Sequence, residues 1–221
     1  MRNFAVAFTL TAALALPLHA AEHAHPRPHT FESTKTDALW SALMAGNHRY
    51  VGGSLEYRTL RERRSATAKA QNPPVTVLSC ADSRVPPELI FDRTVGDLFV
   101  VRVAGNIADD FELASIEFAI ANGWTKLIVI MGHEECGAVK AALEPGDPPT
   151  PSLLALVTRI REALHADADR ENLRAATDAN TRYTAEYLTT HSKVIKDAVE
   201  KGTVKIVSAY YAFDGSVMKL H

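Results

Sequence analysis

Cysteine is scarce in this chain, which has only two among its 221 residues. Two cysteines exclude both the multi-bridge framework of a small secreted domain and a zinc finger closed by four cysteines. An excess of charge of one sign is also missing, because 24 Lys and Arg residues stand against 26 Asp and Glu residues. The formal net charge of −2 gives no bulk attraction to nucleic acid or to an anionic membrane surface, so we expect neither as a partner.

Long hydrophobic runs are missing as well once residues 1–21 are set aside. No later stretch approaches the roughly 20 apolar residues that span a bilayer. The chain is 47% hydrophobic and 23% charged, a composition typical of one globular domain. The Pro-rich segment from Glu144 to Pro151 is too short for a domain linker, and we see no internal repeats. We therefore expect a single domain over residues 34–221.

Residues 1–21 have the features of a secretory signal peptide. Arg2 supplies a positive charge, Phe4 to Leu18 is a mostly apolar run, and small residues follow at Ala20 and Ala21. The alternative is an N-terminal membrane anchor, but the run is short for one. We expect cleavage and export to an oxidising compartment, most simply a bacterial periplasm.

Residues 22–33 follow as a leader in which His23, His25 and His29 lie among prolines. Such a run can hold a metal loosely, but termini of this kind are commonly disordered. We expect a disordered leader that contains His and Pro, with the folded domain starting at residue 34.

Strand-like and helix-like segments alternate in the rest of the chain. Near-continuous apolar runs, typical of parallel strands covered on both faces, occur at Val75–Cys80, Leu98–Val103, Lys126–Met131 and Val204–Tyr210. Helical patterns occur at Thr34–Val51, Arg58–Ala70, Phe111–Asn122, Cys136–Leu143, Ser152–Ala166 and Asn172–Lys201. The alternation predicts an α/β fold, with a mostly parallel sheet of four to five strands flanked by helices. The valines of the second strand are expected to lie in the sheet core, and a short last strand is expected at Ser216–Leu220.

Two groups of chemically active residues follow two of the predicted strands. Cys80 ends the first strand, while His133 and Cys136 come just after the third. Open α/β sheets have their ligand crevice at the carboxyl ends of the strands, so we expect these three side chains to meet. Two sulfurs and one imidazole nitrogen suit zinc best among the common metals. Three protein ligands leave one tetrahedral position open, which is typical of a catalytic rather than a structural zinc.

Asp82 and Arg84 lie close behind the first cysteine. Asp82 can bind the metal as a fourth ligand and shut the site, or it can stand beside a metal-bound water. An Arg84 guanidinium with two hydrogen bonds to the carboxylate would hold it off the metal. Alternatively, Cys80 and Cys136 of an exported chain could form a disulfide. A disulfide would leave His133 and the Asp–Arg pair without a role, so we favour the metal site.

The chain resembles the β-class carbonic anhydrases from about Thr34 to its last residue. The resemblance is carried by Cys80-Ala-Asp-Ser-Arg-Val-Pro-Pro-Glu-Leu-Ile-Phe-Asp92, Gly96-Asp-Leu-Phe-Val-Val-Arg-Val-Ala-Gly-Asn106 and Met131-Gly-His-Glu-Glu-Cys-Gly-Ala-Val139. It implies one zinc ion per chain, bound by Cys80, His133 and Cys136, with Asp82 as the alternative fourth ligand and Asp82–Arg84 as the catalytic pair.

The resemblance also implies which residues hold the substrate and how the chains assemble. Gln71, which lies nine residues before Cys80, and Gly137, next to Cys136, are expected to contact carbon dioxide or bicarbonate. The family forms homodimers, often paired as a dimer of dimers, with the active site at the subunit interface. We expect the same assembly here.

A few positions depart from the family pattern. Ala81 replaces a more usual serine after the first cysteine, and we expect no consequence. Some members have an inhibitory bicarbonate pocket made of a tryptophan three residues before the first cysteine, an arginine and a late tyrosine. Arg102 and Tyr210 could match the last two, but Val77 replaces the tryptophan, so we expect this regulation to be lacking.

The reaction implied by the resemblance is the reversible hydration of carbon dioxide to bicarbonate and a proton, by a zinc-dependent lyase that uses zinc-bound hydroxide. Two thiolates donate more charge to the ion than two imidazoles. We therefore expect activity to rise on the alkaline side of about pH 7, the pKa of zinc-bound water in a three-histidine carbonic anhydrase. Two alternatives stay open. One is hydrolysis of carbonyl sulfide or carbon disulfide on the same fold, and the other is an exported zinc-buffering protein, which would need neither Asp82 nor Arg84.

Overall fold

The computed structural model describes residues 31, 33–56, 60–170 and 172–221. The signal peptide expected over residues 1–21 lies outside this part of the chain, as does nearly all of the leader expected over residues 22–33. Both therefore stay predictions. Within the described ranges, no helix is long and apolar enough to cross a membrane.

The described residues form one sheet flanked by helices. The strands are β1 (Val75–Ser79), β2 (Leu98–Arg102), β3 (Leu127–His133), β4 (Lys205–Tyr211) and β5 (Val217–Lys219). The α-helices are α1 (Thr36–Val51), α2 (Leu60–Thr67), α3 (Pro87–Ile90), α4 (Asp110–Ala121), α5 (Gly137–Leu143), α6 (Pro151–Glu162), α7 (Leu173–His191) and α8 (Lys193–Glu200). Two short 3-10 helices are η1 (Ala104–Asn106) and η2 (Asp167–Arg170).

The sheet has the strand order β2-β1-β3-β4-β5. The first four strands in this order run parallel, and β5 is antiparallel to β4. β1 and β3 lie at the centre and are buried along their whole lengths. Strands covered on both faces need continuous apolar runs, which is why these two were visible in the sequence. The predicted fold class, a mostly parallel sheet of four to five strands flanked by helices, is confirmed.

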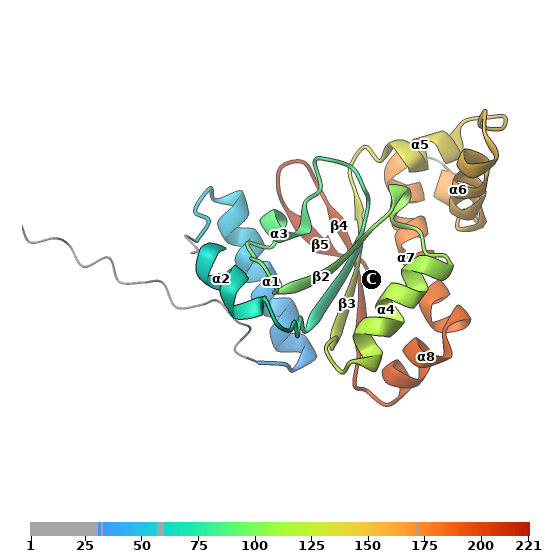
Figure 1. The fold of residues 1–221 in the computed structure, drawn as a ribbon. Coiled ribbons are helices and arrows are strands. Elements are labelled where there is room, and N and C mark those ends of the chain that lie inside the picture. Colours follow the sequence, from blue (N-terminus) through green and yellow to red (C-terminus); the bar gives the residue numbers. More distant parts are fainter. Residues whose placement is uncertain (1–30, 32, 57–59, 171) are drawn as a thin grey trace, which may run out of the picture.

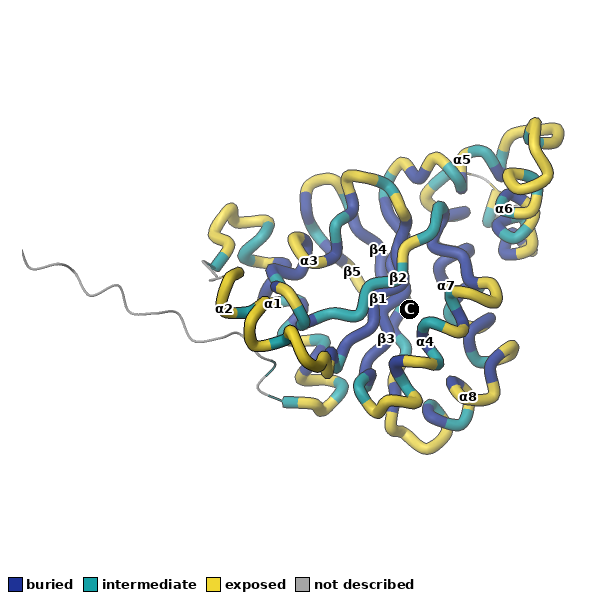
Figure 2. The backbone as a smooth tube through the Cα atoms, viewed as in Figure 1, coloured by how far each residue is buried: buried dark blue, intermediate teal, exposed yellow. Residues whose placement is uncertain are grey.

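Helices cover both faces of this sheet (Figure 1). Because successive side chains of a strand point to opposite faces, the residues of β3 divide between two cores. Val129 packs with Leu39 and Leu43 of α1 on one face. Ile128 and Ile130 pack on the other face with residues of α4, α7 and α8. Figure 2 shows the result, in which buried strands lie between helices whose outer surfaces are exposed.

A third apolar cluster lies beyond the carboxyl ends of β1 and β3. It contains Cys80, Cys136 and Ile160 together with further residues of α5, α6 and α7. The two cysteine side chains are therefore surrounded mainly by apolar groups rather than by solvent.

Two details differ from the sequence prediction. The single helix expected over Asn172–Lys201 is two helices, because the chain leaves helical geometry at Ser192 (φ −126°, ψ 114°). The hydroxyl of Ser192 accepts a hydrogen bond from the N–H of Ile195 and so caps α8. In addition, β2 is an edge strand, so its valines are half-buried rather than fully buried, although Val101 packs against the second core.

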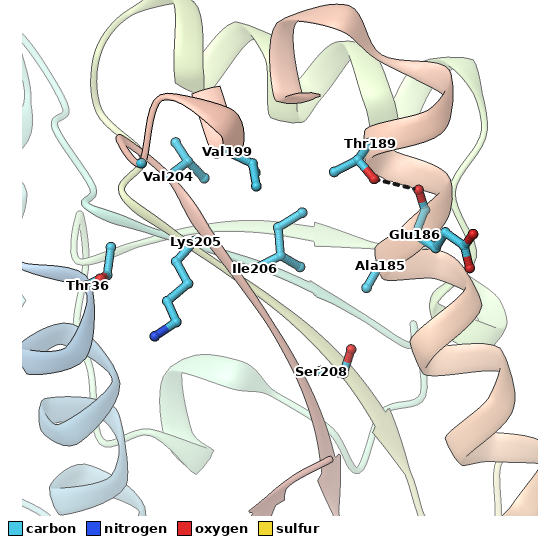
Figure 3. A pocket seen from close by; sticks show the side chains of 10 residues that line it. Thr36, Ala185, Glu186, Thr189, Val199, Val204, Lys205, Ile206 and Ser208 are labelled. Atoms are coloured by element: carbon cyan, nitrogen blue, oxygen red, sulfur yellow. Dashed lines mark hydrogen bonds between the residues drawn. The ribbon is translucent and has the colours of Figure 1, made fainter. Parts of the chain in front are cut away.

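β5 covers only part of β4. The two strands pair at Ala209–Tyr211, whereas the start of β4 has a strand partner only on its β3 side among the described residues. Beside this uncovered stretch lies a hollow of about 540 Å³, bordered by α7, α8 and the start of α1 (Figure 3). The ammonium group of Lys205, on the uncovered stretch, lies 2.8 Å from a carboxylate oxygen of Asp37. A paired charge therefore stands at this edge of the sheet.

Candidate active site

Three metal-binding side chains meet at the carboxyl ends of β1 and β3. Cys80 directly follows β1, His133 is the last residue of β3, and Cys136 directly precedes α5. Their donor atoms all lie within 4.8 Å of one another, and all three residues are buried. Both cysteines are free. The structure thus brings together the three residues that the sequence pattern linked to a metal.

The turn between His133 and Cys136 is tightly constrained. Glu135 has a left-handed φ of 51°, which is unusual for a residue with a Cβ and bends the chain sharply between the two ligands. Just before the turn, Gly132 lets α7 approach β3 closely, because a Cβ there would collide with the side chain of Thr181. The backbone, and not only the side-chain chemistry, therefore positions the ligands.

His133 presents one particular nitrogen to the cysteines. Its Nδ1 lies 2.7 Å from the carbonyl oxygen of Glu134. A carbonyl oxygen only accepts hydrogen bonds, so Nδ1 carries the proton and Nε2 keeps its lone pair. Nε2 is buried and has no hydrogen-bond partner in the described part of the chain. Such a buried lone pair is unfavourable, and a metal ion held with the two sulfurs would satisfy it.

The pKa values of the two thiols are shifted in opposite directions. The hydrogen bond with Cys136 is the main cause that lowers the pKa of Cys80, and the N–H of Gly105, 3.3 Å from its Sγ, acts in the same direction. The same contact with Cys80, together with burial, raises the pKa of Cys136. A metal ion bound here would be held by both sulfurs as thiolates.

Arg84 holds Asp82 with two side-chain hydrogen bonds. Its Nε lies 2.9 Å from Oδ1 and its Nη2 lies 2.7 Å from Oδ2, while its backbone N–H also donates to Oδ1. These hydrogen bonds hold the pKa of the Asp82 carboxyl well below its usual range and raise the pKa of Arg84. Both carboxylate oxygens are engaged in this way, and Asp82 is not one of the three clustered donors. The geometry favours Asp82 beside the metal rather than on it.

Two further side chains hold the pair in place. Arg102 donates to the carbonyl oxygens of Cys80 (3.0 Å) and Asp82 (2.6 Å), which fixes the backbone between them. Phe213, in the turn after β4, has its ring centre 4.3 Å from the guanidinium carbon of Arg84. Sequence reasoning missed Phe213, because it lies in no motif and reaches Arg84 only through the order of the strands.

The structure separates the two residues that were expected to hold substrate. Gly137 begins α5 next to Cys136, is exposed and lines a hollow of about 530 Å³. Gln71 lies before β1 and Cys80 lies after it, so the five-residue strand, roughly 16 Å long, lies between them. Gln71 instead lines an exposed hollow of about 430 Å³ at the amino end of the sheet. Within one chain Gln71 does not reach the cysteines, and its role stays a prediction.

The residues considered for an inhibitory bicarbonate pocket lie apart. Arg102 belongs to β2 and Tyr210 to β4, and β1 and β3 lie between these strands. The guanidinium carbon of Arg174 lies 3.6 Å from the ring centre of Tyr210, and Val77 packs in the core beside α1. Within one chain, these three side chains therefore do not come together in one pocket.

Known proteins share both the sequence and the fold around this site. The profile of the family described as "Carbonic anhydrase" matches residues 75–217. A carbonic anhydrase of Mycolicibacterium smegmatis is 38% identical over 189 residues, which cover 81% of this chain and 91% of that protein. The β-carbonic anhydrase of Coccomyxa, solved in complex with acetazolamide, has a TM-score of 0.65 at 24% identity, over 72% of this chain and 77% of that one. A tetrameric β-carbonic anhydrase of Sordaria macrospora has a TM-score of 0.64 at 21% identity, over 82% of this chain and 96% of that one.

This chain belongs to the β-class carbonic anhydrase family. The matched span runs from the start of β1 to the start of β5 and contains the cysteines, the histidine and the Asp–Arg pair. Two sulfurs and the unpartnered Nε2 of His133 form a donor set that suits zinc. The residues present therefore fit the metal that the family resemblance implies.

Proposed function

We propose that this protein catalyses the reversible hydration of carbon dioxide to bicarbonate and a proton, with one zinc ion per chain held by Cys80, His133 and Cys136. The observation that carries the proposal is the donor cluster together with an Asp82 carboxylate held by two side-chain hydrogen bonds from Arg84. A site that only stored metal would need the donors but no positioned carboxylate. When bound, zinc supplies the Lewis acidity that makes water a nucleophile near neutral pH.

Asp82 is the residue that orients the attacking oxygen. Its pKa is far below neutral, so the carboxylate is a hydrogen-bond acceptor throughout the physiological range. Arg84 fixes the plane of the carboxylate, and Arg102 fixes the backbone on which it stands. With its remaining lone pairs, Asp82 accepts a hydrogen bond from the O–H of the attacking water. This hydrogen bond directs the oxygen at the carbon of carbon dioxide. Gly137 leaves room for the substrate beside Cys136.

We further propose that a second copy of the chain completes the site, pairing through β2. This strand is an edge of the sheet, and Phe99 and Val101 are half-buried there. On the neighbouring helix α4, Phe111 is 85% exposed and Phe118 is 56% exposed. A half-exposed apolar edge of this kind suits pairing with another strand. The tetrameric relative from Sordaria supports a homodimer or a dimer of dimers.

Such pairing would supply the missing substrate contact. If β2 pairs antiparallel with its copy around a two-fold axis, the amino end of one sheet lies beside the carboxyl end of the other. The partner subunit's Gln71 is then on the same side as Cys80. The separation of these two residues within one chain supports this assignment.

We also propose that the chain is exported to the periplasm after cleavage of residues 1–21. The support is the charged start, the apolar run and the small residues that follow it. The intact mass of protein recovered from a periplasmic extract tests this point. A mass that includes residues 1–21 would contradict it.

Stopped-flow hydration of carbon dioxide by the purified chain from residue 22, with zinc quantified in the same sample, tests the catalytic proposal. We expect fast hydration with about one zinc per chain. Arg84→Ala should lose hydration and keep its zinc, because the substitution removes the group that orients Asp82. Lys193→Ala is the matched control, since Lys193 forms an exposed ion pair of 2.7 Å with Asp197 on α8.

Several outcomes would contradict the proposal. Bound zinc without hydration would direct the assays to carbonyl sulfide and carbon disulfide. Unchanged hydration in Arg84→Ala would remove the role of the Asp–Arg pair in catalysis. A wild-type protein that binds zinc without hydration, and an Arg84→Ala variant that behaves identically in every assay, would favour zinc buffering. A chain with no zinc and no titratable thiols would restore the disulfide alternative.

A further inference from the structure

A buried asparagine outside every motif is connected to the first cysteine through one glycine. Asn180 lies on α7 and is 0% exposed, and its Nδ2 donates to the carbonyl oxygen of Gly105 at 2.7 Å. The N–H of Gly105 in turn donates to Sγ of Cys80 at 3.3 Å. Two hydrogen bonds therefore join α7 to a residue of the donor cluster.

The backbone at Gly105 needs a restraint to keep this arrangement. Gly105 (φ 72°) and Asn106 (φ 45°) are both left-handed, a conformation that is uncommon for residues with a Cβ but that asparagine tolerates better than most. A Cβ at Gly105 would lie 2.8 Å from Cδ1 of Ile160 and 3.2 Å from Cβ of Ala138, so a larger residue would have to displace these side chains, in a backbone conformation that favours glycine. If this turn relaxed towards ordinary φ values, the N–H of Gly105 would turn away from Cys80.

Asn180 differs from its buried neighbours on α7. Thr177 and Thr181 donate their hydroxyl hydrogens to carbonyl oxygens of their own helix, four residues back. Asn180 instead donates to a different segment, and its Oδ1 has no hydrogen-bond partner in the described part of the chain. Burying an amide with an unpartnered oxygen is unfavourable compared with burying a leucine of similar size. The cost is consistent with a role for the donor, which holds Gly105.

We infer that Asn180 is a positioning residue for the metal centre. It fixes the carbonyl group of Gly105, so that the N–H of Gly105 keeps its hydrogen bond to Cys80. The inference rests on the proposed function, because it requires Cys80 to bind metal as a thiolate. An N–H that points at a thiolate stabilises its negative charge and lowers the energy of the sulfur lone pairs. Without that hydrogen bond, metal retention weakens and the lone pairs rise in energy.

Cobalt(II) substitution gives a readout that does not depend on catalysis, because a thiolate bound to cobalt produces a sulfur-to-metal charge-transfer band. Asn180→Leu keeps the size of the side chain and removes the donor. Asn180→Ala removes the donor with a smaller side chain, should the first variant fail to fold. We expect the band to move to longer wavelength in both variants. We also expect the zinc dissociation constant, measured by chelator competition, to rise about tenfold.

Asn47→Leu is the matched control. Asn47 is a second buried amide, and its Nδ2 donates to the carbonyl oxygens of Ile90 (3.1 Å) and Gly215 (2.8 Å) on the α1 side of the sheet. We expect this variant to unfold at a lower temperature but to keep the charge-transfer band and the zinc affinity of the wild type.

The outcomes separate this inference from the proposed function. An unchanged band and zinc affinity in both Asn180 variants would overturn the inference and leave the proposed function intact. An equal change in Asn47→Leu would show general destabilisation and overturn it too. A wild-type protein without any charge-transfer band would refute the metal site itself, and the inference with it.

Discussion

The two ends of the parallel sheet differ in how much of the proposed active site a single chain provides. At the carboxyl end, three donor atoms lie within 4.8 Å of one another, and Arg84 holds Asp82 with two side-chain hydrogen bonds. At the amino end, Gln71 is exposed beside a hollow of about 430 Å³. Parallel strands end together, so residues that follow different strands meet without help. A residue that precedes a strand lies at the opposite end of the sheet, so Gln71 would contribute to the same site from a neighbouring copy, as proposed above.

Removal of a ligand at the carboxyl end is the change with the largest expected effect. Cys80→Ser and Cys136→Ser each replace a thiolate by a hydroxyl group, which is a poor zinc ligand at neutral pH. We expect zinc content near zero and hydration at the uncatalysed rate in both variants, measured by mass spectrometry of the metal and by stopped flow. Full zinc content in either variant would place the site elsewhere and remove the contrast between the two ends.

Complementation between two defective variants tests whether the two ends meet across an interface. Gln71→Ala and Arg84→Ala should each lower activity by roughly 100-fold, because each misplaces a reacting group. A mixed dimer has one site in which both residues are intact. Equal amounts of the two variants, mixed under conditions of subunit exchange, should therefore recover about a quarter of the wild-type activity. No recovery on mixing would break the comparison, because Gln71 would then act within its own chain or not at all.

Phe213 gives a smaller effect that sharpens the description of the carboxyl end. Phe213→Leu keeps an apolar cover over Arg84 but removes the ring face, whereas Phe213→Trp keeps a ring. We expect kcat/KM to fall roughly two- to fivefold in the leucine variant, which corresponds to an exposed cation–π contact. The tryptophan variant should stay close to the wild type in the same stopped-flow assay. Equal rates in all three proteins would show that Phe213 does not help to hold Arg84.

The pH dependence of stability gives the smallest expected effect. Arg84 lowers the pKa of Asp82 below the ordinary carboxyl value of about 3.9 in the folded state. Around these pKa values the folded state binds fewer protons than the unfolded chain. The ion pair therefore stabilises the fold above about pH 4. This stabilisation is lost as the pH falls further, through the pKa of Asp82 in the folded state. Asp82→Asn should lower the unfolding temperature by roughly 2–4 °C at neutral pH, with a gap that narrows below about pH 4.

Calorimetry of the wild type, Asp82→Asn and Gln71→Ala would check this expectation at both ends of the sheet. Gln71 carries no charge, so its substitution should shift the unfolding temperature by the same amount at every pH. A pH-independent gap for Asp82→Asn would show that the ion pair adds nothing to the fold.

The carboxyl end could be predicted from the sequence because its residues directly follow apolar runs. The first strand was expected at Val75–Cys80 and occurs at Val75–Ser79, and the third runs two residues further than expected, to His133. The ends of buried runs therefore located the ligands. Gln71 precedes the first predicted strand, so its location at the amino end of the sheet, opposite the ligands, could also have been predicted.

The rest could not be predicted because it depends on which elements become neighbours. Nothing in the valines of β2 shows that this strand lies at an edge, and nothing local to Phe213 or Asn180 connects them to Arg84 or to Gly105. The break between α7 and α8 at Ser192 has a local cause instead, because a serine that can cap a helix is present in the sequence. Helix-forming residues on both sides of Ser192 made the segment resemble one continuous helix, so the capping serine was not recognised.

The uncovered start of β4 bears on how the protein behaves at high concentration. An edge strand with open backbone groups can template the pairing of further chains and so lead to aggregation. Lys205 stands on this stretch with its ammonium group 2.8 Å from Asp37, so an incoming strand would have to displace an ion pair before it could dock. An apolar substitution at Lys205 would leave the catalytic end of the sheet unchanged. It would allow other chains to pair with the start of β4 and would lower the solubility of the protein.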